Sequence, residues 1–416
     1  MARRVIVIGS GVAGVSACLR IFEECPGTQI SLVSHQSRMA PSNDQSKIVR
    51  ADYANLERMM EAQRAQKAWK KGSFASHCIE RGRIVAYAEH DKTLQSIDKN
   101  REDLGLRPRP RGNKAFFETF FGPSHAPDDF IYVHNSDDAV VDWMPCMVKH
   151  EQKARDICHQ TQGRVYETEV MSLQHDGNRV TAAIFANGDR IDTSGCDIVL
   201  AVGSWTMEVL QKSEIELPPQ HRVPVPTGLF AFELELNDEQ VEFFKDKPVF
   251  SHVGRAEFVP PIREGRTAKL TWVEPFTVSQ IRDVSTSALA HRVLENAAGW
   301  ARQMLPRLQG ARVRAIRFYC DGVTETQAPL ITRHPGIENL ILACGGSYTR
   351  AKDLPTDGGY VARLLNEEGG PERFTWKGAT STEQDQPLLV GRTNFECLEE
   401  QAQKELGDRF PLCIVI

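Results

Sequence analysis

Three glycines near the N-terminus have the spacing that binding of a dinucleotide requires. Gly9, Gly11 and Gly14 follow a run of β-branched residues and precede a helical pattern. In such a turn the first glycine permits the bend, the second admits a pyrophosphate close to the backbone, and the third lets the helix pack on the strand. The N–H groups of Val12 and Ala13 at the helix N-terminus would complement the phosphate charge. The pattern predicts a dinucleotide site, and a purely structural turn is the alternative.

Basic side chains form a second group that could do chemistry. Lys47 and Arg50 lie three residues apart in a polar segment, so they would share one face if that segment were helical. A solvated charged face is the alternative. Lys269 lies in a strand-like run of apolar and β-branched residues. An ammonium group pointing inward there is costly without a function or a partner, and an outward-facing strand lysine is the alternative.

The second predicted strand ends without the acidic residue that usually binds an adenosine ribose. Ile30–Val33 forms the strand, and Ser34 followed by His35 occupies the position at its end. Ser34 can still hydrogen-bond a ribose hydroxyl, but it provides no charge-assisted contact. The ribose half of the dinucleotide pattern is therefore weaker than the pyrophosphate half.

Apolar strand runs end in glycine turns at two further places, Cys196–Trp205 and Asn339–Ser347. Three such junctions predict neighbouring strands of one sheet that face one cofactor. The expected fold is α/β, with a discontinuous Rossmann-like cofactor domain. Longer alternating strands between about 227 and 274 predict a second domain with a mixed or antiparallel sheet. The proposed ranges are 1–60, 140–226 and 310–370 for the cofactor domain, 61–139 and 227–309 for the substrate domain, and 371–416 for a C-terminal tail.

Local patterns predict individual elements. A helix is expected over Val12–Glu24, and a second over Leu56–Lys71 with its larger apolar residues, Met59, Met60 and Trp69, facing inward. Turn residues between about 168 and 191 predict a β-meander. A longer amphipathic helix is expected from about Val278 to Leu305.

Composition excludes several classes of protein. The 416 residues are 41% hydrophobic and 25% charged with a net charge of -5, which is typical of a globular protein without a basic field for nucleic acid. No apolar run of ~18 residues and no charged-then-apolar leader occurs, so we expect no membrane span and a cytoplasmic location. The ten cysteines include no CxxC pair, so most should be free, buried thiols and no metal site is expected.

The last four residues, Cys413-Ile414-Val415-Ile416, have the form of a prenylation box. The preceding residues lack the basic run that usually provides the second membrane signal. An apolar tail packed on the body of the protein is the alternative.

Several segments together resemble the flavin-dependent amine oxidases of the D-amino-acid oxidase superfamily. The similarity runs from Arg3 to about Leu365 and is greatest to monomeric sarcosine oxidase and the fructosyl amino acid oxidases (amadoriases), with their fungal biosynthetic relatives. The matching segments are Asn43-Asp44 with Lys47 to Arg50, Gly203-Ser204-Trp205, Ala268-Lys269-Leu270, His334-Pro335, Gly345-Gly346-Ser347 and Lys352 to Pro355.

The resemblance implies FAD as cofactor and assigns roles to these residues. Arg50 and Lys352 would bind the substrate carboxylate, and Lys269 would lie over the flavin and promote its reaction with oxygen. Such roles are physically reasonable, because cations attract a carboxylate strongly in a partly dry pocket and an ammonium group stabilises negative charge developing on oxygen. Lys47 would lie beside the flavin. The remaining cofactor contacts would come from Ser42, Gly203, Trp205, Gly346 and Ser347.

Two departures from the family pattern concern the flavin. Family members attach the flavin to a Cys fifteen residues before the His of the His-Pro pair, and here that position is Tyr319, with Cys320 one residue later. A one-residue slip turns a strand side chain to the opposite face, so covalent attachment through Cys320 requires a bulge, and non-covalent binding is the alternative. The family's Gly-His-Gly-Phe is replaced by Tyr348 to Ala351, which indicates a substrate unlike sarcosine.

The hypothesis that follows is an oxidase of a secondary amine, an N-substituted amino acid or biosynthetic intermediate. Hydride transfer to flavin N5 would give an imine, and O2 would be reduced to hydrogen peroxide. One alternative is a flavin dehydrogenase or desaturase that uses another electron acceptor. A relative that binds a dinucleotide without turnover is the other. The oligomeric state is not indicated by the sequence.

Overall fold

A six-stranded sheet carries the N-terminal glycine turn in the computed structural model, which describes residues 2–217, 224–376, 393–406 and 416. The strand order is β19-β20-β13-β1-β2-β9, and neighbours are parallel except for β19 and β20. The strands are β1 (Arg4–Ile8), β2 (Gln29–Ser34), β9 (Val165–Glu167), β13 (Asp197–Leu200), β19 (Leu330–Arg333) and β20 (Leu340–Cys344). The three strands that end in glycine turns, β20, β13 and β1, are adjacent, which confirms that prediction.

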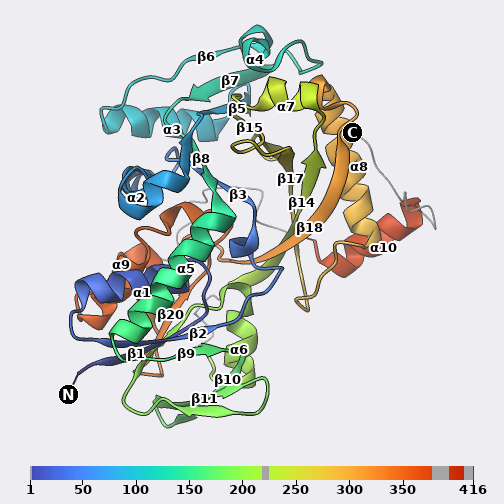
Figure 1. Cartoon of the computed structure of the whole chain (residues 1–416). Coiled ribbons are helices and arrows are strands. Elements are labelled where there is room, and N and C mark those ends of the chain that lie inside the picture. The colour runs from blue at the N-terminus through green and yellow to red at the C-terminus, as the bar shows by residue number, and fades with distance from the viewer. Residues whose placement is uncertain (1, 218–223, 377–392, 407–415) are drawn as a thin grey trace.

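Both faces of this sheet are covered, as Figure 1 shows. On β1, Val5 and Val7 pack toward the helices α1 (Val12–Glu24), α5 (Trp143–Gln160) and α9 (Gly358–Leu365). The alternate residues Ile6 and Ile8 pack on the other side. That side is covered by the predicted meander, β10 (Val170–Asp176), β11 (Arg179–Phe185) and β12 (Arg190–Asp192), and by α6 (Thr206–Lys212). Burial on both faces explains why these strands have continuous apolar runs.

A second, eight-stranded sheet has the order β18-β14-β17-β16-β15-β5-β7-β6. Its strands are β5 (Arg83–Ala88), β6 (Arg111–Gly112), β7 (Phe130–Asn135), β14 (Val225–Glu235), β15 (Val249–His252), β16 (Ala256–Val259), β17 (Thr267–Thr277) and β18 (Arg312–Val323). A phenylalanine-rich core joins this sheet to α4 (Lys114–Phe121), α7 (Asp238–Phe244), α8 (Ala288–Met304) and α10 (Phe395–Leu406). β18 falls in the predicted 310–370 segment, yet it is hydrogen-bonded along its length to β14.

A small sheet of β3 (Ser46–Val49), β8 (Ala139–Asp142) and β4 (Cys78–Glu80) connects the two regions. Because β3 is extended and Arg50 follows it directly, Lys47 and Arg50 do not share a helical face. Helix α2 (Leu56–Trp69) lies nearby, with α3 (Lys92–Asp103) farther along the chain. A short 3-10 turn, η5 (Ala351–Asp353), contacts β3 and brings Lys352 close to it.

Individual elements agree with the local patterns to different degrees. Helix α1 has the predicted bounds. In α2, Met59 and Trp69 are fully buried, but the inward placement of Met60 was wrong, because its side chain is 44% exposed. The helix predicted from about Val278 begins only at Ala288, where the Ser287 side chain accepts a hydrogen bond from the Ala290 N–H and caps it.

Other expectations concern cysteines, metals and the membrane. The nine cysteines within the described residues are free, and seven of them are buried. No helix in the described parts of the chain is long and apolar enough to cross a membrane, and the same residues hold no cluster of metal-ligating side chains. The prenylation box at Cys413 lies outside the described residues.

Candidate cofactor and substrate site

The turn between β1 and α1 is built for close approach of a phosphate. Gly9 has φ of +109°, and a Cβ there would overlap the Ala201 carbonyl. A Cβ on Gly14 would overlap the Gly9 carbonyl oxygen, so helix and strand meet at these two glycines. Gly11 is the N-cap of α1 and provides no side-chain cap for the first N–H groups. These donors and the positive end of a 13-residue helix suit a pyrophosphate.

Alanine substitutions at Gly14 and Gly11 should therefore have different effects. Gly14→Ala should destabilise the apoprotein by about 1–3 kcal/mol, because the methyl group meets backbone that cannot move aside. Gly11→Ala, whose Cβ would lie 3.4 Å from the Ser42 hydroxyl, should leave the apoprotein nearly as stable. Urea unfolding of both variants measures the difference. Equal destabilisation by the two substitutions would contradict this description of the turn.

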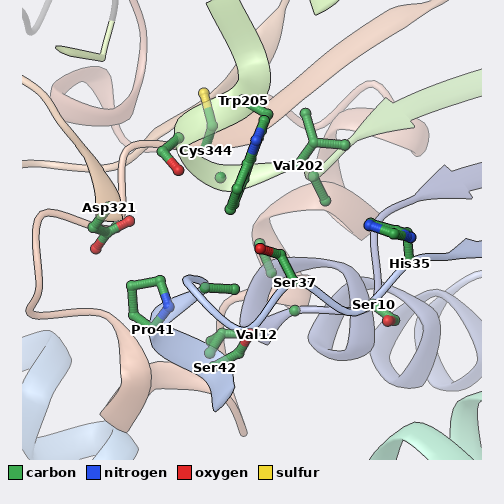
Figure 2. Close-up of a pocket in the computed structure, with 18 of the residues that line it drawn as sticks. Ser10, Val12, His35, Ser37, Pro41, Ser42, Val202, Trp205, Asp321 and Cys344 are labelled. Atoms are coloured by element: carbon green, nitrogen blue, oxygen red, sulfur yellow. The ribbon is translucent and has the colours of Figure 1, made fainter. Parts of the chain in front are cut away.

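A cavity of about 520 Å³ begins at this turn and runs along the carboxyl ends of β1, β13 and β20. In Figure 2, Val12, Pro41 and Ser42 lie on one side of it and Val202 and Trp205 on the other, with Asp321 at one end and His35 at the opposite end. The predicted cofactor residues that line it are Gly9, Gly11, Val12, Ala13, Ser42, Lys47, Gly203, Trp205, Cys320 and Gly346. The glycine turn, its bare helix N-terminus and the elongated cavity fit a bound dinucleotide.

One end of the cavity is formed by a carboxylate that sequence reasoning missed. Asp321, near the end of β18, accepts hydrogen bonds from the N–H groups of Tyr348 (2.7 Å) and Gly322 (2.8 Å). Burial raises the pKa of Asp321 to about 6. A Cβ on Gly346 would lie 2.8 Å from the Asp321 carboxylate, which explains the glycine there. Ser347 and Tyr348 both have positive φ in this turn.

Lys47 and Lys269 meet at one buried carboxylate. The Nζ atoms of both lysines lie 2.8 Å from Oδ2 of Asp44, and Lys269 also donates to the Ser46 carbonyl at 2.7 Å. Burial alone would raise the pKa of Asp44, but the two ammonium groups hold it well below its usual range. Tyr319 lies 3.3 Å from the other carboxylate oxygen. We call Asp44, Lys47, Lys269 and Tyr319 the Asp44 cluster; it contains two cations and one carboxylate.

Arg50 and Lys352 meet over one aromatic ring. The Arg50 guanidinium carbon is 5.2 Å from the centroid of the Tyr53 ring, and the Lys352 Nζ is 4.6 Å from it. Arg58 lies 5.0 Å from the same centroid. We call Arg50, Tyr53, Arg58 and Lys352 the Tyr53 cluster. The structure thus brings together the two residues that the resemblance assigns to the substrate carboxylate.

Charge in the Tyr53 cluster is only partly compensated. Arg58 and Lys352 both pair with Asp353, at 2.9 and 3.4 Å, and Arg58 also lies 3.6 Å from the carboxylate of Glu61. Arg50 donates to the Tyr53 hydroxyl at 3.2 Å and has no ion pair recorded within the described residues. Burial and the nearby Arg58 lower the pKa of Lys352 to about 8. Burial would raise the pKa of Tyr53, but the surrounding cations lower it to about 8. The lowered pKa of Tyr53 reflects the positive charge of the cations around its ring.

The structure also places residues away from the cavity wall. Gly14, Ser34, Arg50, Lys269, Ser347 and Lys352 are not among its lining residues. Lys269 contacts the cavity-lining Lys47 only through Asp44, and Ser34 bonds to Ser10 and Glu151. Residues that sequence reasoning did not single out, among them Gln36, Glu151 and Asp321, do line the cavity.

Cys320 lies on the opposite face of β18 from its neighbours. Tyr319 belongs to the Asp44 cluster and the Asp321 carboxylate forms one end of the cavity. Cys320 also borders the cavity, but its side chain is buried in the apolar core that contains Phe318. The ladder between β18 and β14 is continuous from Ala315 to Val323, without a bulge. Burial raises the pKa of the Cys320 thiol to about 12.

The Rossmann-like sheet, the glycine turn and the elongated cavity define a dinucleotide-binding protein. The DAO family, described as FAD dependent oxidoreductase, matches residues 4–364, and the chain belongs to this family. The superfamily resemblance and the fold class predicted from sequence are therefore confirmed.

Particular relatives are similar over nearly the whole chain. L-saccharopine oxidase of Schizosaccharomyces pombe is 22% identical over 91% of this chain and 93% of its own. Amadoriase I of Aspergillus fumigatus has a similar fold, with a TM-score of 0.73 and 20% identity over 94% of this chain and 93% of that chain. A modified fructosyl peptide oxidase of Aspergillus nidulans has a TM-score of 0.77 and 16% identity over 95% of this chain and 98% of that chain.

Proposed function

We propose that the protein is an FAD-dependent oxidase of a secondary amine that carries a carboxylate. The observation that carries this proposal is the convergence of Arg50 and Lys352 on the Tyr53 ring, in a chain of the FAD-dependent family. Cations in a buried site favour an anionic group, and a fixed carboxylate would hold the neighbouring amine in one orientation.

The bound FAD would supply the redox chemistry: it would accept a hydride from the substrate C–H bond, while the amine N–H releases a proton as the C=N bond forms, and two electrons and two protons would then convert O2 to hydrogen peroxide. The protein residues have two tasks. Arg50 and Lys352 bind the carboxylate. The Asp44 cluster keeps the ammonium groups of Lys47 and Lys269 in fixed positions, where positive charge can stabilise negative charge that develops on oxygen.

The names of the relatives narrow the substrate class. Saccharopine and fructosyl peptides are both N-substituted amino acids or peptides, in which a secondary amine is attached close to a carbonyl or carboxyl group. We infer that an N-substituted amino acid of this kind is oxidised at the carbon next to nitrogen, and that the resulting imine is hydrolysed or cyclises.

Oxygen consumption and peroxide release with a panel of such amines test this function. The FAD-loaded protein should consume oxygen and release an equal amount of peroxide with at least one N-substituted amino acid. Oxidation of substrate with an artificial electron acceptor but without peroxide would instead identify a dehydrogenase.

We propose further that the flavin is held without a covalent bond, because Cys320 is buried on the apolar face of β18. Acid precipitation of the purified yellow protein should leave the flavin in the supernatant, and Cys320→Ser should retain as much flavin as the wild-type protein. Yellow colour in the wild-type pellet, lost in Cys320→Ser, would contradict this proposal.

The pKa values in the Tyr53 cluster predict how the binding of a carboxylate depends on pH. Lys352 is charged below its pKa of about 8 and neutral above it, while Tyr53 gains negative charge above its own pKa of about 8. Both changes remove positive charge as pH rises. The Kd of a dicarboxylate without an amine, such as glutarate, should therefore increase above pH 8, by up to about tenfold per unit for each proton.

Perturbation of the flavin spectrum by glutarate measures this Kd without interference from a substrate amine. Lys352→Met should bind glutarate more weakly at neutral pH and with less dependence on pH. A Kd that stays constant from neutral to alkaline pH in the wild-type protein would show that Lys352 does not bind the carboxylate.

A further inference from the structure

The acidic residue missing from the end of β2 has a counterpart on α5. We propose that Glu151 binds a hydroxyl of the adenosine ribose of FAD, the contact usually made by an acidic residue at the end of the second strand. Glu151 lines the cofactor cavity, whereas Ser34, at the end of β2, does not. The proposal depends on FAD, the cofactor of the family, and is independent of the amine reaction proposed above.

Ser34 holds Glu151 in place instead of facing the ligand. The Ser34 hydroxyl is 2.9 Å from Oε1 of Glu151 and 2.8 Å from the hydroxyl of Ser10. A serine hydroxyl has a single proton, so donation to the carboxylate leaves Ser34 to accept from Ser10. Helix α5 packs directly on β2, which brings together two residues 117 positions apart in the sequence.

The carboxylate keeps one free acceptor position. Oε1 accepts hydrogen bonds from Ser34 and from Arg155 (2.9 Å), and Oε2 accepts one from Gln36 (2.8 Å). An ionised carboxylate has about four acceptor positions, so one remains on Oε2. Arg155 compensates the charge of this buried residue, which is 7% exposed. The carboxylate is thus oriented by three donors and can accept a fourth from a ligand hydroxyl.

The position along the cavity agrees with a ribose. Ser10 belongs to the pyrophosphate turn, and Figure 2 shows it beside His35, at the end of the cavity opposite Asp321. Ser34 connects Ser10 to Glu151, so Glu151 lies just beyond the pyrophosphate turn on the β2 side. In a dinucleotide the adenosine ribose follows the pyrophosphate in this direction.

Titration of the apoprotein with FAD, followed by flavin fluorescence, tests the assignment without any turnover. Glu151→Gln should bind FAD about 10- to 100-fold more weakly, the usual range for loss of a hydrogen bond to a charged group. Glu167→Gln is the matched control, because Glu167 pairs with the same Arg155, at 2.6 Å, but has a side chain that is 74% exposed and is not among the residues that line the cavity. This variant should bind FAD like the wild-type protein.

Analogues of FAD that lack the 2′- or the 3′-hydroxyl of the adenosine ribose provide a second test of the proposal. The wild-type protein should bind one of them at least about tenfold more weakly than FAD, and Glu151→Gln should bind that analogue and FAD equally. If Glu151→Gln does not fold, Glu151→Asp, with its carboxylate one methylene farther away, should show reduced discrimination. Equal binding of FAD and both analogues by the wild-type protein, or unchanged discrimination in the variants, would overturn the proposal and leave the proposed reaction untouched.

Discussion

Replacement of Lys269 by methionine is expected to slow the reaction of the reduced enzyme with dioxygen by about 10²–10³-fold, the usual cost of losing one preorganised charge or donor. Reduction by substrate should change far less. The expectation follows from the position of Lys269, whose ammonium group is buried and fixed by Asp44 and the Ser46 carbonyl. A positive charge in a site that excludes water stabilises the negative charge on oxygen more strongly than the same charge in water would.

Stopped-flow measurement of the two half-reactions separates these effects. Anaerobic mixing with substrate gives the rate of reduction, and mixing of the reduced protein with oxygenated buffer gives the rate of reoxidation. Lys245→Met is a suitable control, because it removes an exposed lysine that pairs with Glu242 far from the cavity. Equal slowing of both half-reactions in Lys269→Met would assign Lys269 to substrate binding or to the integrity of the Asp44 cluster.

Replacement of Arg50 by methionine should lower kcat/KM by about 10²-fold or more, because a substrate carboxylate would then lose its uncompensated partner in a buried site. Arg50 is the cation of the Tyr53 cluster that forms no ion pair with a carboxylate of the described residues, and its hydrogen bond goes to the Tyr53 hydroxyl. Arg50→Lys should lower kcat/KM less than Arg50→Met does, because lysine keeps the positive charge. It should still be less active than the wild-type protein, because lysine lacks the bidentate geometry of the guanidinium group.

A substrate analogue without the carboxylate provides the control for Arg50. The wild-type protein should oxidise this analogue poorly, and Arg50→Met should oxidise it no more slowly than the wild-type protein does. Steady-state kinetics with both compounds complete the comparison. A similar loss with both compounds would show that Arg50 acts on the fold or the cofactor and not on the carboxylate.

The six-stranded Rossmann-like sheet was largely predictable from the sequence because its signals are local. Each of β1, β13 and β20 is an apolar run that ends in a glycine turn, and α1 has clear limits. The position of Met60 was not predictable in this way, because helical spacing alone does not show where the buried face of α2 ends.

The arrangement of the site could not be predicted in this way, because it depends on contacts between residues that are far apart in the sequence. Asp44 and Lys47 are neighbours in the sequence, but Lys269 reaches Asp44 across 225 positions. Lys47 and Arg50 lie in and just after a strand, which turns them toward different clusters. Glu151 on α5 and Asp321 on β18 line the cavity only because their elements pack beside the glycine turns. These residues carry no motif, so three-dimensional structure was needed to find them.

Anaerobic mixing of the FAD-loaded protein with L-saccharopine, and with other N-substituted amino acids, tests the proposed function most directly. At least one of these amines should bleach the yellow flavin absorbance. Admission of air should restore the absorbance and release hydrogen peroxide. Retention of the yellow colour with every such amine, in protein that binds FAD, would contradict the assignment of this site to amine oxidation.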